Sequence, residues 1–229
     1  IMFSYLGWVA AQITALGLVF NLLTQGYVSI TMGMVIGTAI VLIYTLYGGM
    51  WSVAMTDFVQ MIVIAVGLLA IAWYAADLAG GAGKVVEYAA REGKFQFFPT
   101  GGLKDWTFFF AAAITMMLGS IPQQDVFQRV MSSNSAETAR TGPIIGGVLY
   151  LLFAFIPMFV VVAAVLVMPE TAQALLQDDP QKVLPTLVME RMPLFLQIAF
   201  FGALLSAIMS TASATLLAPS TTFVENILR

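Results

Sequence analysis

Long uninterrupted apolar runs dominate the pattern of hydrophobic and polar positions along this chain. Residues 1–56 include no Asp, Glu, Lys or Arg, and most charged residues lie between the later runs. Because the apolar residues are continuous and do not alternate with polar ones, the pattern predicts transmembrane helices. A helix needs about 20 apolar residues to cross a bilayer. Six runs are candidates for such helices: residues 1–23, 28–47, 51–76, 106–121, 143–168 and 193–218.

The composition strengthens this interpretation and excludes several classes of protein. Hydrophobic residues make up 60% of the chain and charged residues 9%, whereas an average soluble domain has roughly 25% charged residues. We therefore predict an all-α integral membrane protein. The net charge of −3 argues against a nucleic-acid partner. The absence of histidine and cysteine excludes Ser-His and Cys-His catalysis and histidine metal sites.

An intramembrane enzyme would need a nucleophile with its base, or paired carboxylates. The carboxylates embedded among the apolar runs are those of Asp57 and Asp125. Neither lies in the Gly-x-Gly-Asp context of an intramembrane protease. We therefore expect no enzymatic activity and no cofactor.

The organisation of the chain is simple, without low-complexity segments or short repeats. We expect one transmembrane domain over residues 1–229. The chain begins at Ile1 within an apolar run, without the charged segment of a signal peptide, so we expect a fragment.

Two places interrupt the apolar pattern. Asp57 lies six residues into the third run, where a carboxylate is costly unless it faces water, a cation or a partner. The alternative is an interfacial Asp that caps the helix after the Gly48-Gly49 turn. The fourth run is short, and Gly119 and Pro122 at its end predict a broken helix whose free carbonyl groups line a cavity. An ordinary helix end is the alternative there.

The sixth run is rich in hydroxyl groups and has no charge. At 3.6 residues per turn, Ala207, Ser210 and Thr211 share one helix face, and Ser206 and Ser213 flank it. A small hard cation such as sodium prefers oxygen ligands, and these residues offer hydroxyl and carbonyl oxygens together. The alternative is helix packing, because membrane helices use Ser, Thr, Ala and Gly to approach one another closely.

Three blocks of sequence resemble the sodium/solute symporter family. The first block is Tyr44–Gln60, with a Gly-Gly turn followed by Thr-Asp and Gln. The second block is Phe127-Gln128-Arg129, and the third is Ser206–Thr211. Their order and spacing are compatible with the family over nearly the whole chain. The residues in these blocks are most similar to those of the high-affinity choline transporter branch.

The resemblance implies a bundle of two inverted five-helix repeats. The chain would supply the third to eighth core helices, so the fragment would be truncated at both ends. In this family the sixth run would bind sodium through the Ala207 carbonyl and the Ser210 and Thr211 hydroxyls. Asp57 would lie on the inner exit path of the ion.

The resemblance also implies two residues at the solute. Trp8 falls where the choline branch places an aromatic side chain that faces the substrate. Gln123 stands where that branch has tryptophan, so an aromatic box for a quaternary ammonium would lose one wall. A glutamine adds a donor and an acceptor, which suits a solute with a carboxylate or hydroxyl beside its amine. The alternative for Trp8 is an aromatic residue that packs or faces lipid near the membrane interface.

These observations predict a sodium-coupled symporter of a small organic solute, an amine such as choline, betaine or an amino acid, that works by alternating access. The expected partners are the solute, sodium as coupling ion and the lipid bilayer. We expect a multi-pass protein of a cell membrane, such as the bacterial inner membrane. The alternative function is a membrane sensor in which a symporter-like domain is coupled to a signalling module.

Overall fold

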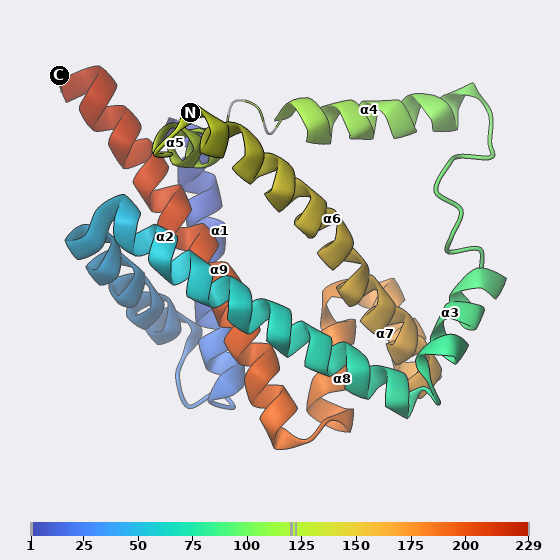
Figure 1. The fold of residues 1–229 in the computed structure, drawn as a ribbon. Coiled ribbons are helices and arrows are strands. Elements are labelled where there is room, and N and C mark those ends of the chain that lie inside the picture. Colours follow the sequence, from blue (N-terminus) through green and yellow to red (C-terminus); the bar gives the residue numbers. More distant parts are fainter. Residues whose placement is uncertain (1, 120, 122, 229) are drawn as a thin grey trace. The chain divides into compact units, whose positions relative to one another are not determined.

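The described part of the chain, residues 2–119, 121 and 123–228 of a computed structural model, is built from helices and contains no strand (Figure 1). This confirms the predicted all-α class. The α-helices in order are α1 (Met2–Leu23), α2 (Ile30–Leu78), α3 (Ala82–Arg91), α4 (Leu103–Gly119), α5 (Gln124–Met131), α6 (Ala136–Val167), α7 (Pro169–Asp178), α8 (Val183–Arg191) and α9 (Leu194–Phe223). A 3₁₀-helix, η1 (Pro180–Lys182), precedes α8, and a π-helix, η2 (Val224–Leu228), follows α9.

The chain divides into two compact units. The first unit is Ile1–Leu68 together with Pro193–Arg229, and the second is Leu69–Met192. The prediction of one transmembrane domain stays a prediction. Among the residues that the structure describes, four helices are long and apolar enough to cross a membrane, and α4 with α5, bent by 45°, would be a fifth span.

Helix α2 contains two of the predicted spans. Its 49 residues would measure ~74 Å as a straight helix, more than twice the thickness of the hydrocarbon core. The backbone leaves the helical conformation at Gly49, with φ 51° and ψ −144°. Residues with a Cβ rarely adopt a positive φ of this kind, so glycine permits the kink. The six predicted spans therefore fall within five helices, α1, α2, α4, α6 and α9.

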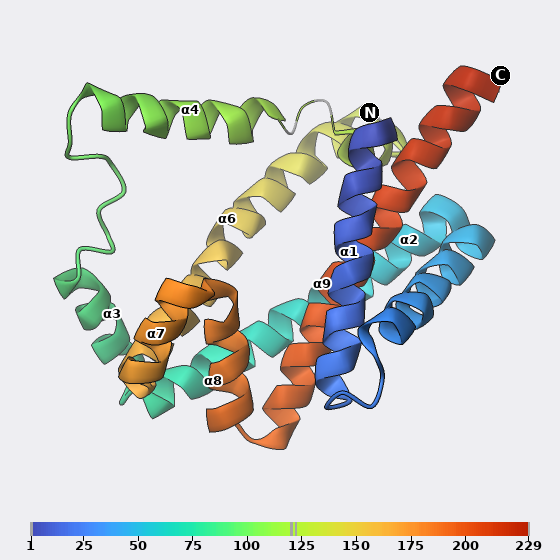
Figure 2. The same cartoon turned by 180° about the vertical axis from the view of Figure 1, so that it is seen from behind.

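The first unit is organised around α1 and α9, which pack along each other (Figures 1 and 2). The first and sixth apolar runs of the sequence therefore lie side by side. Leu16 of α1, Val41 of α2 and Ala212 of α9 form its buried core. Partly buried side chains pack against this core: Tyr44, Leu205, Ile208, Met209 and Leu216.

Helix α1 and the beginning of α2 approach each other at two glycines. A Cβ atom added to Gly33 would lie 2.8 Å from the Phe20 Cβ and 3.0 Å from the Gly17 carbonyl oxygen. A Cβ added to Gly17 would lie 2.6 Å from the Ile30 carbonyl oxygen. Small residues permit this backbone approach, as they do in many membrane helix pairs.

We expect Gly17→Ala to destabilise the full-length protein by about 1–3 kcal/mol, because the new methyl group overlaps a backbone oxygen that cannot move alone. Gly7→Ala on the same helix is the control, since nothing lies within 4 Å of its added Cβ. Thermal unfolding of both purified variants measures the difference. Equal unfolding temperatures for Gly17→Ala and Gly7→Ala would contradict the close approach.

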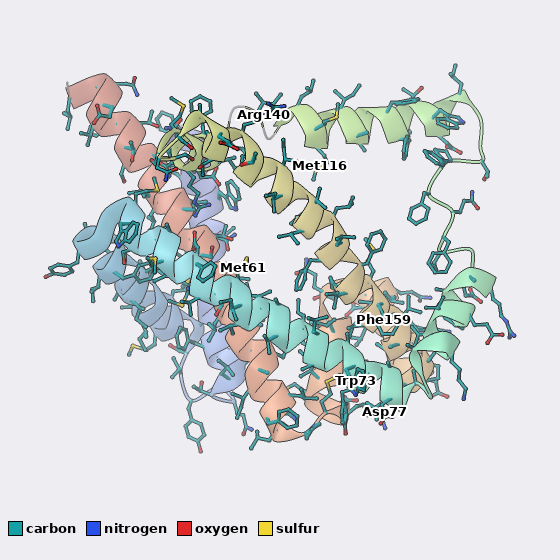
Figure 3. The ribbon with its side chains drawn as sticks, viewed as in Figure 1. Met61, Trp73, Asp77, Met116, Arg140 and Phe159 are labelled. Atoms are coloured by element: carbon teal, nitrogen blue, oxygen red, sulfur yellow. The ribbon has the colours of Figure 1, made fainter. Side chains whose placement is uncertain are left out.

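The second unit is organised around α6, which contacts α3, α5, α7 and α8. The α6 residues Val160, Ala163 and Ala164 are buried. Phe159 of the same helix lines an open cavity of about 950 Å³ together with residues of α3, α7 and the segment between α3 and α4 (Figure 3). Its lining is mostly apolar.

Two helix ends of this unit are well defined. The Asp179 carboxylate accepts a hydrogen bond from the Gln181 N–H at 3.2 Å and caps η1. Helix α4 ends at Gly119 and α5 begins at Gln124, so the predicted end of the fourth span is confirmed. Pro122, the other residue of the predicted break, lies outside the described residues.

Candidate functional site

The hydroxyl-rich part of α9 places the predicted sodium ligands on one face. Ala207, Ser210 and Thr211 are half-buried, whereas Ser213 and Thr215 are buried. The Thr211 hydroxyl donates a hydrogen bond to the Ala207 carbonyl oxygen at 3.0 Å. Two of the three predicted ligand oxygens therefore lie next to each other, and Ser210 lies on the same turn of the helix.

The neighbouring hydroxyls also donate to carbonyl groups of α9. The Ser213 hydroxyl donates to the Ser210 carbonyl at 2.9 Å, and the Thr215 hydroxyl donates to the Thr211 carbonyl at 2.8 Å. A hydroxyl that donates its proton to a carbonyl still has lone pairs. Thr211 can therefore offer lone pairs to a cation while its O–H still donates to the Ala207 carbonyl oxygen.

Neutral oxygens are the candidate cation ligands of this part of the fold. Within residues 2–119, 121 and 123–228, no group of three or more acidic side chains is placed to hold a metal ion. A site of hydroxyl and carbonyl oxygens suits a monovalent cation better than a divalent one, because it supplies no full negative charge to offset dehydration.

Asp57 lies in the first unit, on α2, and is half-buried. It follows the kink at Gly49 by about two turns of helix, which is too far for it to cap the second half of α2. The Tyr44 side chain interacts electrostatically with Asp57 and lies beside the Ser213 hydroxyl. Asp57 is thus related to α9 only through Tyr44, and its position on the exit path of the ion stays a prediction.

Tyr44 is a residue of this region that the sequence interpretation did not select. Its hydroxyl donates a hydrogen bond to the Met209 carbonyl oxygen at 3.2 Å, from α2 to α9. Met209 directly precedes Ser210 in the chain. A signal was present in the sequence, because Tyr44 opens the first of the three family-like blocks, but a tyrosine in an apolar run is commonly an interfacial residue.

Two further polar atoms of α2 are buried in the first unit. Thr45 Oγ1 and Gln60 Oε1 make no hydrogen bond within the part of the chain that the structure describes. Gln60 follows Asp57 by three residues, so both lie on one face of the helix. Buried polar atoms normally have partners, so the Gln60 carbonyl oxygen is available as an additional acceptor on this face of α2.

The two predicted solute residues belong to different units. Trp8 on α1 is 36% exposed, and its ring lies 5.8 Å from the ring of Tyr5 with a tilt of 35°. Gln123 precedes α5 in an extended conformation and is half-buried. That each side chain binds the solute, and that both bind the same solute molecule, stay predictions.

Comparisons with known proteins agree with the blocks noted in the sequence. A family model described as the sodium:solute symporter family matches residues 1–229. The chain is 31% identical to the high affinity choline transporter 1 of Homo sapiens, over 96% of this chain and 38% of that protein. It is 30% identical to the choline transporter of the same name from Torpedo marmorata, over 96% of this chain and 38% of the relative.

A relative named for a different substrate is less similar. The sodium/glucose cotransporter 4 of Danio rerio is 25% identical, over 84% of this chain and 34% of that protein. The chain thus spans between about a third and two fifths of the length of the curated relatives it matches. No solved structure gives a significant match.

Proposed function

The chain belongs to the sodium:solute symporter family, and we propose that the complete protein couples the movement of sodium to the uptake of a small organic amine. The observation that supports this most directly is the pairing of the Thr211 hydroxyl with the Ala207 carbonyl on α9, with Ser210 on the same turn. These are the three residues that the family resemblance assigns to sodium.

The ion would bind to the Ala207 carbonyl and the Ser210 and Thr211 hydroxyls, with further ligands from other parts of the complete protein. Neutral oxygens bind a monovalent cation strongly enough to select it and weakly enough to release it. Asp57 would attract sodium as it leaves toward the inner side. Its electrostatic interaction with Tyr44, whose hydroxyl reaches α9, supports this assignment.

The solute would be a small cationic or zwitterionic molecule with an amine. Several relatives are named as choline transporters, and the partly exposed ring of Trp8 suits an ammonium group. Gln123 provides an amide donor and acceptor for a second polar group. We therefore favour an amine that also has a carboxylate or hydroxyl group. The described chain contains no feature that favours the sensor alternative.

Uptake by the full-length protein in cells tests this function. Radiolabelled choline, betaine, proline and a sugar are each supplied in sodium medium and in medium where potassium replaces sodium. We expect sodium-dependent uptake of at least one of the three amines and none of the sugar. Uptake of the sugar alone, or amine uptake that is equal in both media, would overturn the proposal.

A further inference from the structure

Tyr44 connects helix α2 to helix α9, the helix that bears the candidate cation ligands. Its ring packs against the buried core of Leu16, Val41 and Ala212, and its hydroxyl donates to the Met209 carbonyl at 3.2 Å. The two residues are 165 positions apart in the chain. This hydrogen bond therefore ties α2 to α9 and is not a local feature of either helix.

The accepting carbonyl belongs to the turn of α9 that bears the candidate ligands. Met209 precedes Ser210 and Thr211, and the Ala207 carbonyl lies on the same turn. Ala207, Ser210 and Thr211 have small side chains, whereas Ile208 and Met209 of the same turn pack against the buried core. A directional hydrogen bond from another helix to a carbonyl of this turn adds a constraint on its rotation and on its position along the helix axis.

Polar groups of α2 and α9 surround the Tyr44 side chain. The Ser213 hydroxyl of α9 and the Asp57 carboxylate of α2 both interact with it, and Ser213 in turn donates to the Ser210 carbonyl at 2.9 Å. Tyr44 is thus related to this turn of α9 twice, by its hydrogen bond to the Met209 carbonyl and by its interaction with Ser213.

We propose that Tyr44 is a positioning residue of the sodium site, which holds the Ala207–Thr211 turn of α9 in the place where its oxygens converge on the ion. The inference rests on the proposed sodium coupling. Sodium is bound at short distances by few oxygens, so a small displacement of this turn weakens several ion–oxygen contacts at once. Tyr44 itself makes no contact with the ion in this account.

The test is the binding of radioactive sodium to the purified full-length protein without any solute, comparing Tyr44→Phe with the natural residue. Phenylalanine keeps the ring in the core and removes only the hydroxyl. The loss of one cross-helix hydrogen bond predicts a sodium affinity about three- to tenfold lower. The maximal sodium bound per folded molecule should be unchanged. A merely structural role would lower the folded amount and leave the affinity of the folded molecules unaltered.

Tyr47→Phe is the matched control, because Tyr47 is one turn further along α2 and its side chain is 91% exposed. It should bind sodium as the natural protein does. If Tyr44→Phe does not survive purification, the same titration is made in membranes and normalised to the amount of folded protein. If Tyr44→Phe binds sodium with the same affinity as the unaltered protein, this inference is overturned and the proposed function is not. No saturable sodium binding in the unaltered protein would overturn the proposed function, and this inference with it.

Discussion

Replacing Thr211 or Ser210 by alanine in the full-length protein is expected to lower the apparent affinity for sodium tenfold or more. Each change removes one oxygen from a site that has few, and a tenfold loss corresponds to ~1.4 kcal/mol. Thr211→Ala also removes the hydrogen bond that this hydroxyl donates to the Ala207 carbonyl. The sodium dependence of solute uptake measures the change.

Two variants serve as controls for this prediction. Thr211→Ser keeps the hydroxyl oxygen and should have a mild effect. Ser220→Ala removes an exposed hydroxyl of the same helix that donates to the Leu216 carbonyl at 2.8 Å, and it should leave sodium dependence unchanged. Solute affinity at saturating sodium should change much less than sodium affinity. If both alanine variants keep normal sodium dependence, these hydroxyls serve only helix packing.

Replacing Trp8 by alanine is expected to weaken uptake of the amine strongly, and replacing it by phenylalanine to weaken it less. A tryptophan face attracts a desolvated ammonium by up to about 2 kcal/mol, so its loss would lower apparent solute affinity by as much as about thirtyfold. Phenylalanine keeps a smaller aromatic face. The concentration dependence of uptake at saturating sodium measures both effects.

Trp73→Ala is the control for the loss of an aromatic side chain. Trp73 lies on the second half of α2 and is 81% exposed (Figure 3). Its replacement should leave the affinity for the amine unchanged. Indifference of uptake to Trp8→Ala, or equal effects at Trp8 and Trp73, would show that Trp8 is a packing or lipid-facing residue.

The helices and some of their ends could be predicted from the sequence because the bilayer allows few backbone conformations. Continuous apolar runs must form helices that satisfy their own backbone, and α1 and α9 match two of those runs closely. The Gly48-Gly49 turn marked a change of direction, which the structure places at Gly49. Helix α6 begins at Ala136, before its apolar run, because the Ser135 hydroxyl accepts from the Thr138 N–H and caps a polar first turn.

The candidate site was predictable only where it is local in sequence. Helical spacing places Thr211 above Ala207, and the structure joins these two residues by a hydrogen bond at 3.0 Å. The contact between Tyr44 and Met209 has no such periodicity, since it depends on how α2 packs against α9. The solute residues Trp8 and Gln123 were chosen from the family resemblance, and their roles stay predictions.

The most direct test of the account is accumulation of the solute by the full-length protein in liposomes under an imposed sodium gradient. A potential of ~100 mV, negative inside, supplies about 2.3 kcal/mol per sodium ion, and a tenfold sodium gradient adds ~1.4 kcal/mol. We predict that the amine then accumulates up to several hundred-fold per coupled ion, and that Thr211→Ala shifts this accumulation to higher sodium concentrations. Uptake that stops at equal concentrations inside and outside, with or without the gradient, would contradict sodium-coupled transport.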